Sequence, residues 1–150
     1  MTESPTLPGT PSVTPFLMFE GSARQAVEFY VETFAPVVGG TQVTSLELYG
    51  ADGPGPEGTV AACSFTVAGQ PIRAFDSFVH HGFTFTPAVS FFVELPSAAD
   101  VRTLAATLGE GGGELMPPDA YGFSELFAWV NDRWGVSWQL NSATPAEPGA

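Results

Sequence analysis

Residues 20–30 read EGSARQAVEFY, and this stretch predicts how the fold begins. Its first two residues turn the chain after an apolar segment, residues 13–19, which we interpret as a strand. Ser22 is a favourable helix N-cap, and Gln25 follows three residues later, at the spacing of a capping box. Apolar side chains then recur at helical spacing as far as Phe34. The stretch therefore predicts a strand, a tight turn and a helix that packs one face on a sheet.

The segments that follow this helix have strand patterns. Residues 41–49 alternate apolar and polar side chains, and residues 60–67 and 70–75 flank Ala68-Gly69, which is a hairpin signal. The same order of elements then starts again: a strand, a helix capped by Ser97, and three strands. In this second pass the expected strands cover residues 88–94, 114–116, 125–130 and 136–141.

The two passes are related by a constant offset of 75 residues, because Ser22 corresponds to Ser97 and Gln25 to Asp100. A duplicated β-α-β-β-β unit explains both the repeat and the length of the chain. We therefore expect an α+β fold of two βαβββ modules. The expected boundaries are about residues 13–76 for module one, about 88–141 for module two, and disordered tails over 1–12 and 142–150.

Composition excludes several classes of function. The 150 residues carry 16 Asp and Glu against four Arg and no Lys, giving a formal charge of −12. Proteins bind nucleic acids and anionic membranes through clusters of Lys and Arg, which this acidic chain lacks, so we expect neither as a partner. No apolar run approaches the length of a membrane span, and residues 1–12 lack the features of a secretory signal. The single Cys63 cannot form an internal disulfide, and we expect a cytoplasmic protein.

Four further stretches carry a family resemblance: TPFLMF at 14–19, GPGP at 53–56, FTPAVSF at 85–91 and WGVSWQ at 134–139. Together with residues 20–30, they resemble the vicinal oxygen chelate superfamily, which includes glyoxalase I, extradiol dioxygenases and bleomycin-resistance proteins. More narrowly, they resemble its PhnB-like branch, often described as 3-demethylubiquinone-9 3-methyltransferase. The resemblance covers about residues 13–141.

The resemblance implies two cup-shaped mixed sheets with helices outside, a homodimer and, in many members, a divalent metal in the cup. The ligand positions that can be matched hold Pro15, Ser90 and Gln139, and a fourth falls around residues 74–76. Divalent metals prefer imidazole or carboxylate ligands, so we expect no metal cofactor. The methyltransferase description is also doubtful, because no Gly-rich loop of the kind that cradles a nucleotide-like cofactor joins a strand to a helix.

Strand alternation assigns the faces of the expected cup. If Phe16, Phe91 and Trp138 pack on the helices, the side chains next to them point into the cup. That set mixes apolar walls with a few polar groups, as pockets for small molecules do. The expected pocket residues are Pro15, Leu17, Phe19, Ser90, Phe92, Glu94, Ser137 and Gln139.

Three ionisable side chains are further candidates. His80 and His81 lie between the modules, where His80 is either a general base at the rim of the cup or a solvated loop residue. Glu94 is either an acid–base group or half of a salt bridge.

Three functions follow. The first is a small-molecule binding protein or metal-independent enzyme of unknown substrate. The second is a metal-dependent lyase, isomerase or dioxygenase with ligands displaced to His80, His81, Asp76 or Glu94. The third is a methyltransferase-like role in quinone metabolism.

Overall fold

A computed structural model describes residues 9–143 and contains two helices and eight strands. Module one holds, in chain order, β1 (Phe16–Phe19), α1 (Ala23–Phe34), β2 (Gln42–Leu48), β3 (Val60–Val67) and β4 (Gln70–Asp76). Module two holds β5 (Ser90–Leu95), α2 (Ala98–Gly109), β6 (Gly113–Asp119), β7 (Leu126–Asn131) and β8 (Ser137–Ser142). The predicted order of elements is confirmed in both modules.

The predicted tails are only partly open to comparison, because residues 1–8 and 144–150 lie outside the described residues. Residues 10–12 form neither helix nor strand. The boundary at the other end was placed too early, because β8 continues through Ser142, whose side chain is buried and bonded to Glu125.

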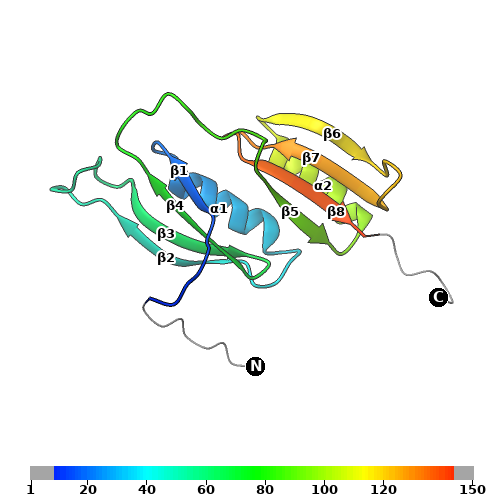
Figure 1. Cartoon of the computed structure of the whole chain (residues 1–150), viewed down its shortest axis with the longest axis horizontal. Coiled ribbons are helices and arrows are strands. Elements are labelled where there is room, and N and C mark those ends of the chain that lie inside the picture. The colour runs from blue at the N-terminus through cyan, green and yellow to red at the C-terminus, as the bar shows by residue number, and fades with distance from the viewer. Residues whose placement is uncertain (1–8, 144–150) are drawn as a thin grey trace.

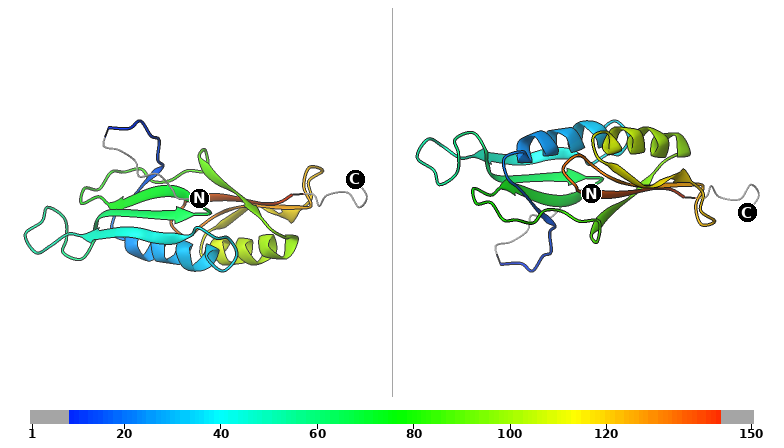
Figure 2. Two further views of the ribbon diagram at one scale, coloured as in Figure 1. Left: turned by 90° about the horizontal axis from the view of Figure 1, so that it is seen from below. Right: turned by 90° about the horizontal axis from the view of Figure 1, so that it is seen from above.

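The two modules have the same sheet topology. Module one has the strand order β1-β4-β3-β2, and module two has β5-β8-β7-β6. In each sheet the first strand pairs in parallel with the last, and the other pairs are antiparallel. The sheets lie side by side (Figure 1), and α1 and α2 cover the same side of both (Figure 2). We call the opposite side, which carries no helix, the helix-free face.

The core continues across the boundary between the modules. Trp138 in module two is fully buried, and its ring lies 5.0 Å from Tyr30 and 5.1 Å from Phe34, both on α1. The carboxylate of Asp132, also in module two, links Tyr30 to Trp138. It accepts hydrogen bonds from Tyr30 Oη at 2.6 Å and from Trp138 Nε1 at 3.0 Å. The repeat therefore folds around one shared core.

The two helices begin in different ways. Ser97 caps α2 as predicted, because its Oγ accepts a hydrogen bond from the backbone N–H of Asp100. The matching prediction for Ser22 is wrong, since its side chain forms no capping bond. Asp76, at the end of β4, accepts from the N–H groups of Gly21 and Ala23 instead. A carboxylate is a favourable cap because it also meets the positive end of the helix dipole.

Strand faces follow the prediction in β5 and β8 but not in β1. Trp138 and Leu140 are buried on the helix side, so the side chains between them point to the helix-free face. In β1 the order is reversed: Leu17 and Phe19 are 8% and 4% exposed within the helix-side core, whereas Phe16 is 55% exposed. All four β1 residues are apolar, so alternation could not distinguish its two faces.

Candidate functional site

Two of the expected pocket residues are bonded to each other. Ser90 begins β5 and Gln139 lies in β8, and Gln139 Nε2 donates a hydrogen bond to Ser90 Oγ at 2.7 Å. Ser137 lies directly opposite Ser90 in the register, and its Oγ accepts from Trp129 Nε1 at 2.7 Å. These neutral polar groups are positioned by the parallel pairing of β5 with β8.

Two cavities adjoin this polar pair. The β1–β5 cavity, of about 450 Å³, is lined by residues that include Pro15, Phe16, Leu17, Phe91, Ser90 and Ser137. A second cavity, of about 580 Å³, shares Pro15, Ser90 and Phe91 with it and extends to Phe92 and Glu94. Both volumes lie in the range of small-molecule sites. The predicted pocket residues that line one or both cavities are Pro15, Leu17, Ser90, Phe92, Glu94 and Ser137, whereas Phe19, Gln139 and His80 line neither.

The donor set at these positions does not fit a divalent metal. Pro15 has no side-chain donor, and the amide of Gln139 is already engaged with the hydroxyl of Ser90. Neither group offers the charge or basicity that such a metal needs. The carboxylate near the fourth position, Asp76, accepts three backbone N–H bonds, the third from Val60, and is 2% exposed.

The displaced ligands that we considered do not converge either. Glu94 is bonded to Asn141, and His80 and His81 contact Glu20. No three His, Cys, Asp or Glu side chains of residues 9–143 lie close enough together to hold a metal ion.

His80 lines another cavity, of about 480 Å³, together with residues that include Glu20, Phe85 and Trp134, and His81 does not line it. Glu20 holds this loop in place, because its carboxylate contacts His80 Nδ1 at 3.0 Å and accepts from the His81 N–H at 3.3 Å. The hydrogen bond to His80, followed by that to His81, lowers the pKa of Glu20 below its usual value. His80 is therefore an exposed rim residue, away from Ser90.

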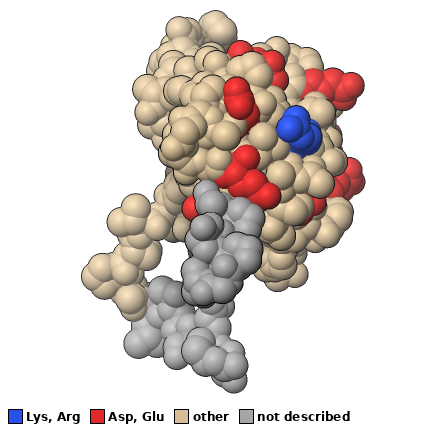
Figure 3. All heavy atoms as spheres, turned by 90° about the vertical axis from the view of Figure 1, so that its right-hand side faces the viewer, with Lys and Arg blue, Asp and Glu red and all other residues tan. Residues whose placement is uncertain are grey.

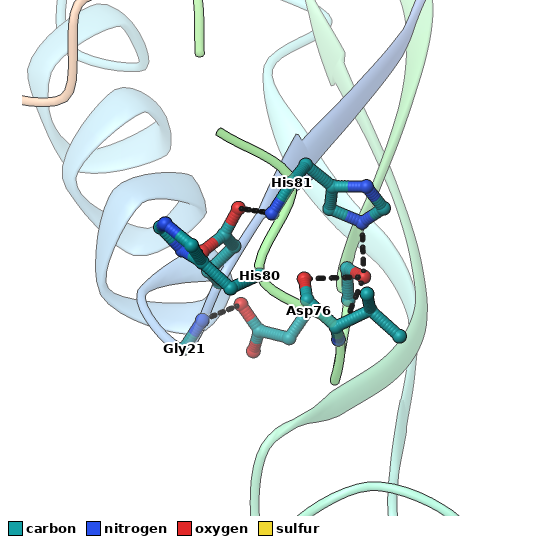
Figure 4. A network of polar contacts seen from close by, with 7 residues as sticks. Gly21, Asp76, His80 and His81 are labelled. Carbon is teal, nitrogen blue, oxygen red and sulfur yellow. Dashed lines mark hydrogen bonds and ion pairs between the residues drawn. The ribbon is translucent and has the colours of Figure 1, made fainter. Parts of the chain in front are cut away.

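Figure 4 shows how this loop meets the end of β4. His81 Nε2 lies 2.6 Å from Ser77 Oγ, and Asp76 turns the other way, toward Gly21 at the start of α1. The arrangement ties the connection between the modules to both β1 and β4. His80 is exposed, and these contacts of the loop with Glu20 and Ser77 fix its position at the rim of the cavity.

Aromatic side chains gather on the helix-free face of module two. Phe92 on β5 and Phe127 on β7 have ring centroids 6.2 Å apart, and Phe123 lies 5.2 Å from Phe127. Tyr121 completes this aromatic cluster at 6.1 Å from Phe127. Phe92 and Phe123 remain 54% and 61% exposed. Exposed apolar patches of this kind mark binding surfaces.

Sequence reasoning missed Arg73, which lies in the middle of β4 on the helix-free face. It faces Phe16 across the parallel pair, with its guanidinium carbon 4.9 Å from the ring centroid. A signal was present, because Arg73 is one of only four basic residues and stands between buried Ile72 and Ala74. The tight burial of its neighbours indicates that Arg73 points to the opposite side.

Acidic side chains dominate other parts of the surface. At the end of the molecule formed by module two, red patches of Asp and Glu far exceed blue ones (Figure 3). This distribution agrees with the net charge of −12 and offers no basic stripe for a phosphate backbone on the face shown. Within residues 9–143, neither helix has the length and apolarity needed to cross a membrane.

Comparison with solved structures defines the class of fold. The chain resembles a glyoxalase/bleomycin resistance protein/dioxygenase from Nocardioides, with 18% sequence identity and a TM-score of 0.54 over 93% of this chain and 88% of that one. Together with the paired four-stranded mixed sheets, this places the chain in the glyoxalase/bleomycin resistance fold, as the sequence predicts. None of the curated proteins compared with the chain matches it.

Within this fold, the chain can be assigned to a particular family. Residues 11–141 match the family described as 3-demethylubiquinone-9 3-methyltransferase, and the chain belongs to this PhnB-like family. A putative 3-demethylubiquinone-9 3-methyltransferase, PhnB protein, from Bacillus cereus is 42% identical, with a TM-score of 0.82 over 89% of this chain and all 100% of that one. A protein from Pseudomonas aeruginosa is 25% identical, with a TM-score of 0.71 over 89% and 98%.

Proposed function

We propose that the chain binds a small molecule, either as a binding protein or as an enzyme that uses no metal, with Ser90 and Gln139 at the polar end of the site. The observation that carries this proposal is the Gln139–Ser90 hydrogen bond beside the β1–β5 cavity. Neutral donors and acceptors occupy the positions where related proteins hold a metal. Such groups orient a ligand by hydrogen bonding, while Phe91 and Leu17 supply apolar walls.

The test is a ligand screen on the full chain by ligand-observed NMR. Ser90→Phe fills the cavity and removes a hydrogen-bonding hydroxyl, so we expect it to weaken the binding of every hit at least tenfold. Thr103→Phe places the same ring on the exposed side of α2 and should leave binding unchanged. A set of hits that bind equally to both variants would show that the site lies elsewhere.

The absence of a metal requirement is tested separately by elemental analysis of protein purified without chelator. We expect less than one tenth of an equivalent of any divalent transition metal, because the donor set lacks imidazole and carboxylate groups. Stoichiometric metal that disappears when His80 and His81 are both replaced by alanine would support the displaced-ligand alternative.

We also propose that the protein is a cytoplasmic homodimer, in which a second copy covers the aromatic cluster. Phe92 and Phe123 would otherwise expose large apolar surfaces. Sedimentation equilibrium should give a dimer for the natural chain and a weaker one for Phe123→Ser. The matched replacement Val13→Ser removes an exposed apolar side chain outside the cluster and should have no effect. A monomeric natural chain at micromolar concentration would contradict the proposal.

A methyltransferase role in quinone metabolism is the second candidate, and the description of the matching family favours it. The test is direct titration with S-adenosylmethionine by calorimetry. Saturable binding that Ser90→Phe abolishes would favour methyl transfer in this site. No heat change at millimolar S-adenosylmethionine would remove this candidate.

A further inference from the structure

Arg73 differs from the other three arginines in its place in the fold, because it lies in the middle of a strand, β4, and not on a helix or in a turn. Arg24 pairs with Glu28 on α1, Arg133 lies over Phe29 and Trp134, and Arg102 is on the exposed side of α2. Arg73 is exposed on the helix-free face and forms no ion pair with any carboxylate of residues 9–143. Arg102 and Arg133 form no ion pair with those carboxylates either, so what distinguishes Arg73 is its position on β4 beside Phe16, which lines the β1–β5 cavity.

The neighbours of Arg73 are apolar or neutral. Register places Phe16 on one side of it and Ser64 on the other, and Ser45 continues this row on β2. Neither the guanidinium of Arg73 nor the hydroxyl of Ser64 forms a hydrogen bond with another group in the described part of the chain. A row of this kind leaves several donors free, and a guanidinium pairs with carboxylate or phosphate oxygens through two parallel N–H bonds.

Phe16 connects this row to the proposed pocket. Its ring holds the Arg73 guanidinium by a cation–π contact, and the same residue lines the β1–β5 cavity together with Ser90. An anionic group bound at Arg73 would therefore leave the rest of a small molecule beside the cavity wall. The net charge of the protein repels anions in general, but Arg73 is the arginine that lies on the helix-free face next to this cavity, so it offers an anion a local attraction there.

We propose that Arg73 is the anion-binding residue of the site and that the ligand is a small organic acid, a carboxylate or phosphonate with an apolar body. The acid group pairs with the guanidinium of Arg73, with Ser64 as an additional donor. The apolar body packs between Phe16 and the wall of the β1–β5 cavity. This inference rests on the proposed small-molecule function and adds the chemical class of the ligand.

The experiment uses a matched library of aromatic and aliphatic carboxylates, phosphonates and their uncharged primary amides, tested on the full chain by ligand-observed NMR. We expect acids to bind and Arg73→Gln to weaken them at least tenfold, which corresponds to about 1.4 kcal/mol. Binding of amides should change less than twofold. Arg102→Gln removes the same charge from α2 and should leave both classes unchanged.

Four outcomes would overturn the inference, and they separate it from the proposed function. Amides that bind as well as acids, or acids that bind Arg73→Gln normally, would refute the role of Arg73 but keep the small-molecule site. A dimer that dissociates in Arg73→Gln while acids still bind would make Arg73 an interface residue. If neither acids nor amides bind the natural chain, the proposed function fails as well.

Discussion

Replacing Asp132 should cost more stability than any other single change to a polar side chain in this protein. Asp132 is 2% exposed, and its carboxylate accepts four hydrogen bonds: from Tyr30 Oη at 2.6 Å, Trp138 Nε1 at 3.0 Å, and the backbone N–H groups of Trp134 and Val136 at 2.9 and 3.0 Å. Asp132→Ala leaves three buried donors without partners: the Tyr30 hydroxyl, the Trp138 indole N–H and the backbone N–H of Val136. Each unsatisfied donor costs about 1–3 kcal/mol, so we expect a loss of about 4 kcal/mol.

The assay is urea unfolding followed by tryptophan fluorescence, since the indole of Trp138 is bonded to this carboxylate and the ring of Trp134 packs on Tyr30. Tyr30→Phe is the milder companion variant, because it removes one of the four bonds and should cost about 1.5 kcal/mol. Asp52→Asn, on the exposed loop between β2 and β3, is the matched control and should change stability by less than about 0.5 kcal/mol. A loss below about 1 kcal/mol for Asp132→Ala would refute the reasoning.

Three further changes test other parts of the structure. Asp76→Ala should lower the free energy of unfolding by about 2–3 kcal/mol, because three N–H groups lose their acceptor. Ser22→Ala should lower it by less than about 0.5 kcal/mol, because the Ser22 side chain forms no capping bond. Equal losses for the two variants in urea unfolding would contradict this. Burial, followed by the charge of Asp132, raises the pKa of Tyr30 well above its usual value. Unfolded Tyr30 therefore ionises first, so stability should fall as the pH rises above about 10, and a natural chain no more alkali-sensitive than Tyr30→Phe would count against this. Because the pKa of Glu20 is lowered, its contact with His80 is present at neutral pH and is lost as the pH falls through that lowered value. The NMR chemical shifts of residues 80–81 should follow the titration of Glu20, and this pH dependence should be absent in Glu20→Gln.

Local patterns in the sequence were sufficient for the order of elements and for the cap of α2. The cap by Ser97 is confirmed, because Ser97 and Asp100 lie within one turn of the chain, although the Asp100 carboxylate accepts from the Ser97 hydroxyl and not from its backbone N–H. The cap of α1 could not be predicted in the same way. Asp76 lies more than 50 residues from the N–H groups that it binds, and only the folded position of β4 brings it there.

The candidate site was predicted best where alternation was clear. β8 reads SWQLNS, so polar and apolar side chains separate onto two faces, and Gln139 lies beside Ser90 on one of them. β1 reads FLMF and has no polar residue to mark its exposed face. The faces of Leu17 and Phe19 were therefore assigned wrongly from the sequence. Arg73 was missed because an isolated basic residue gives no spacing pattern, and its significance depends on the neighbouring strands β1 and β3.

The contact between Tyr30 and Asp132 also has a kinetic consequence. The two residues are separated by 102 positions, so their hydrogen bond cannot form until both modules are largely in place. Interactions that form after the folding transition state act mainly on the rate of unfolding. We therefore expect the seam between the modules, more than the modules themselves, to determine how long a folded molecule survives before it opens.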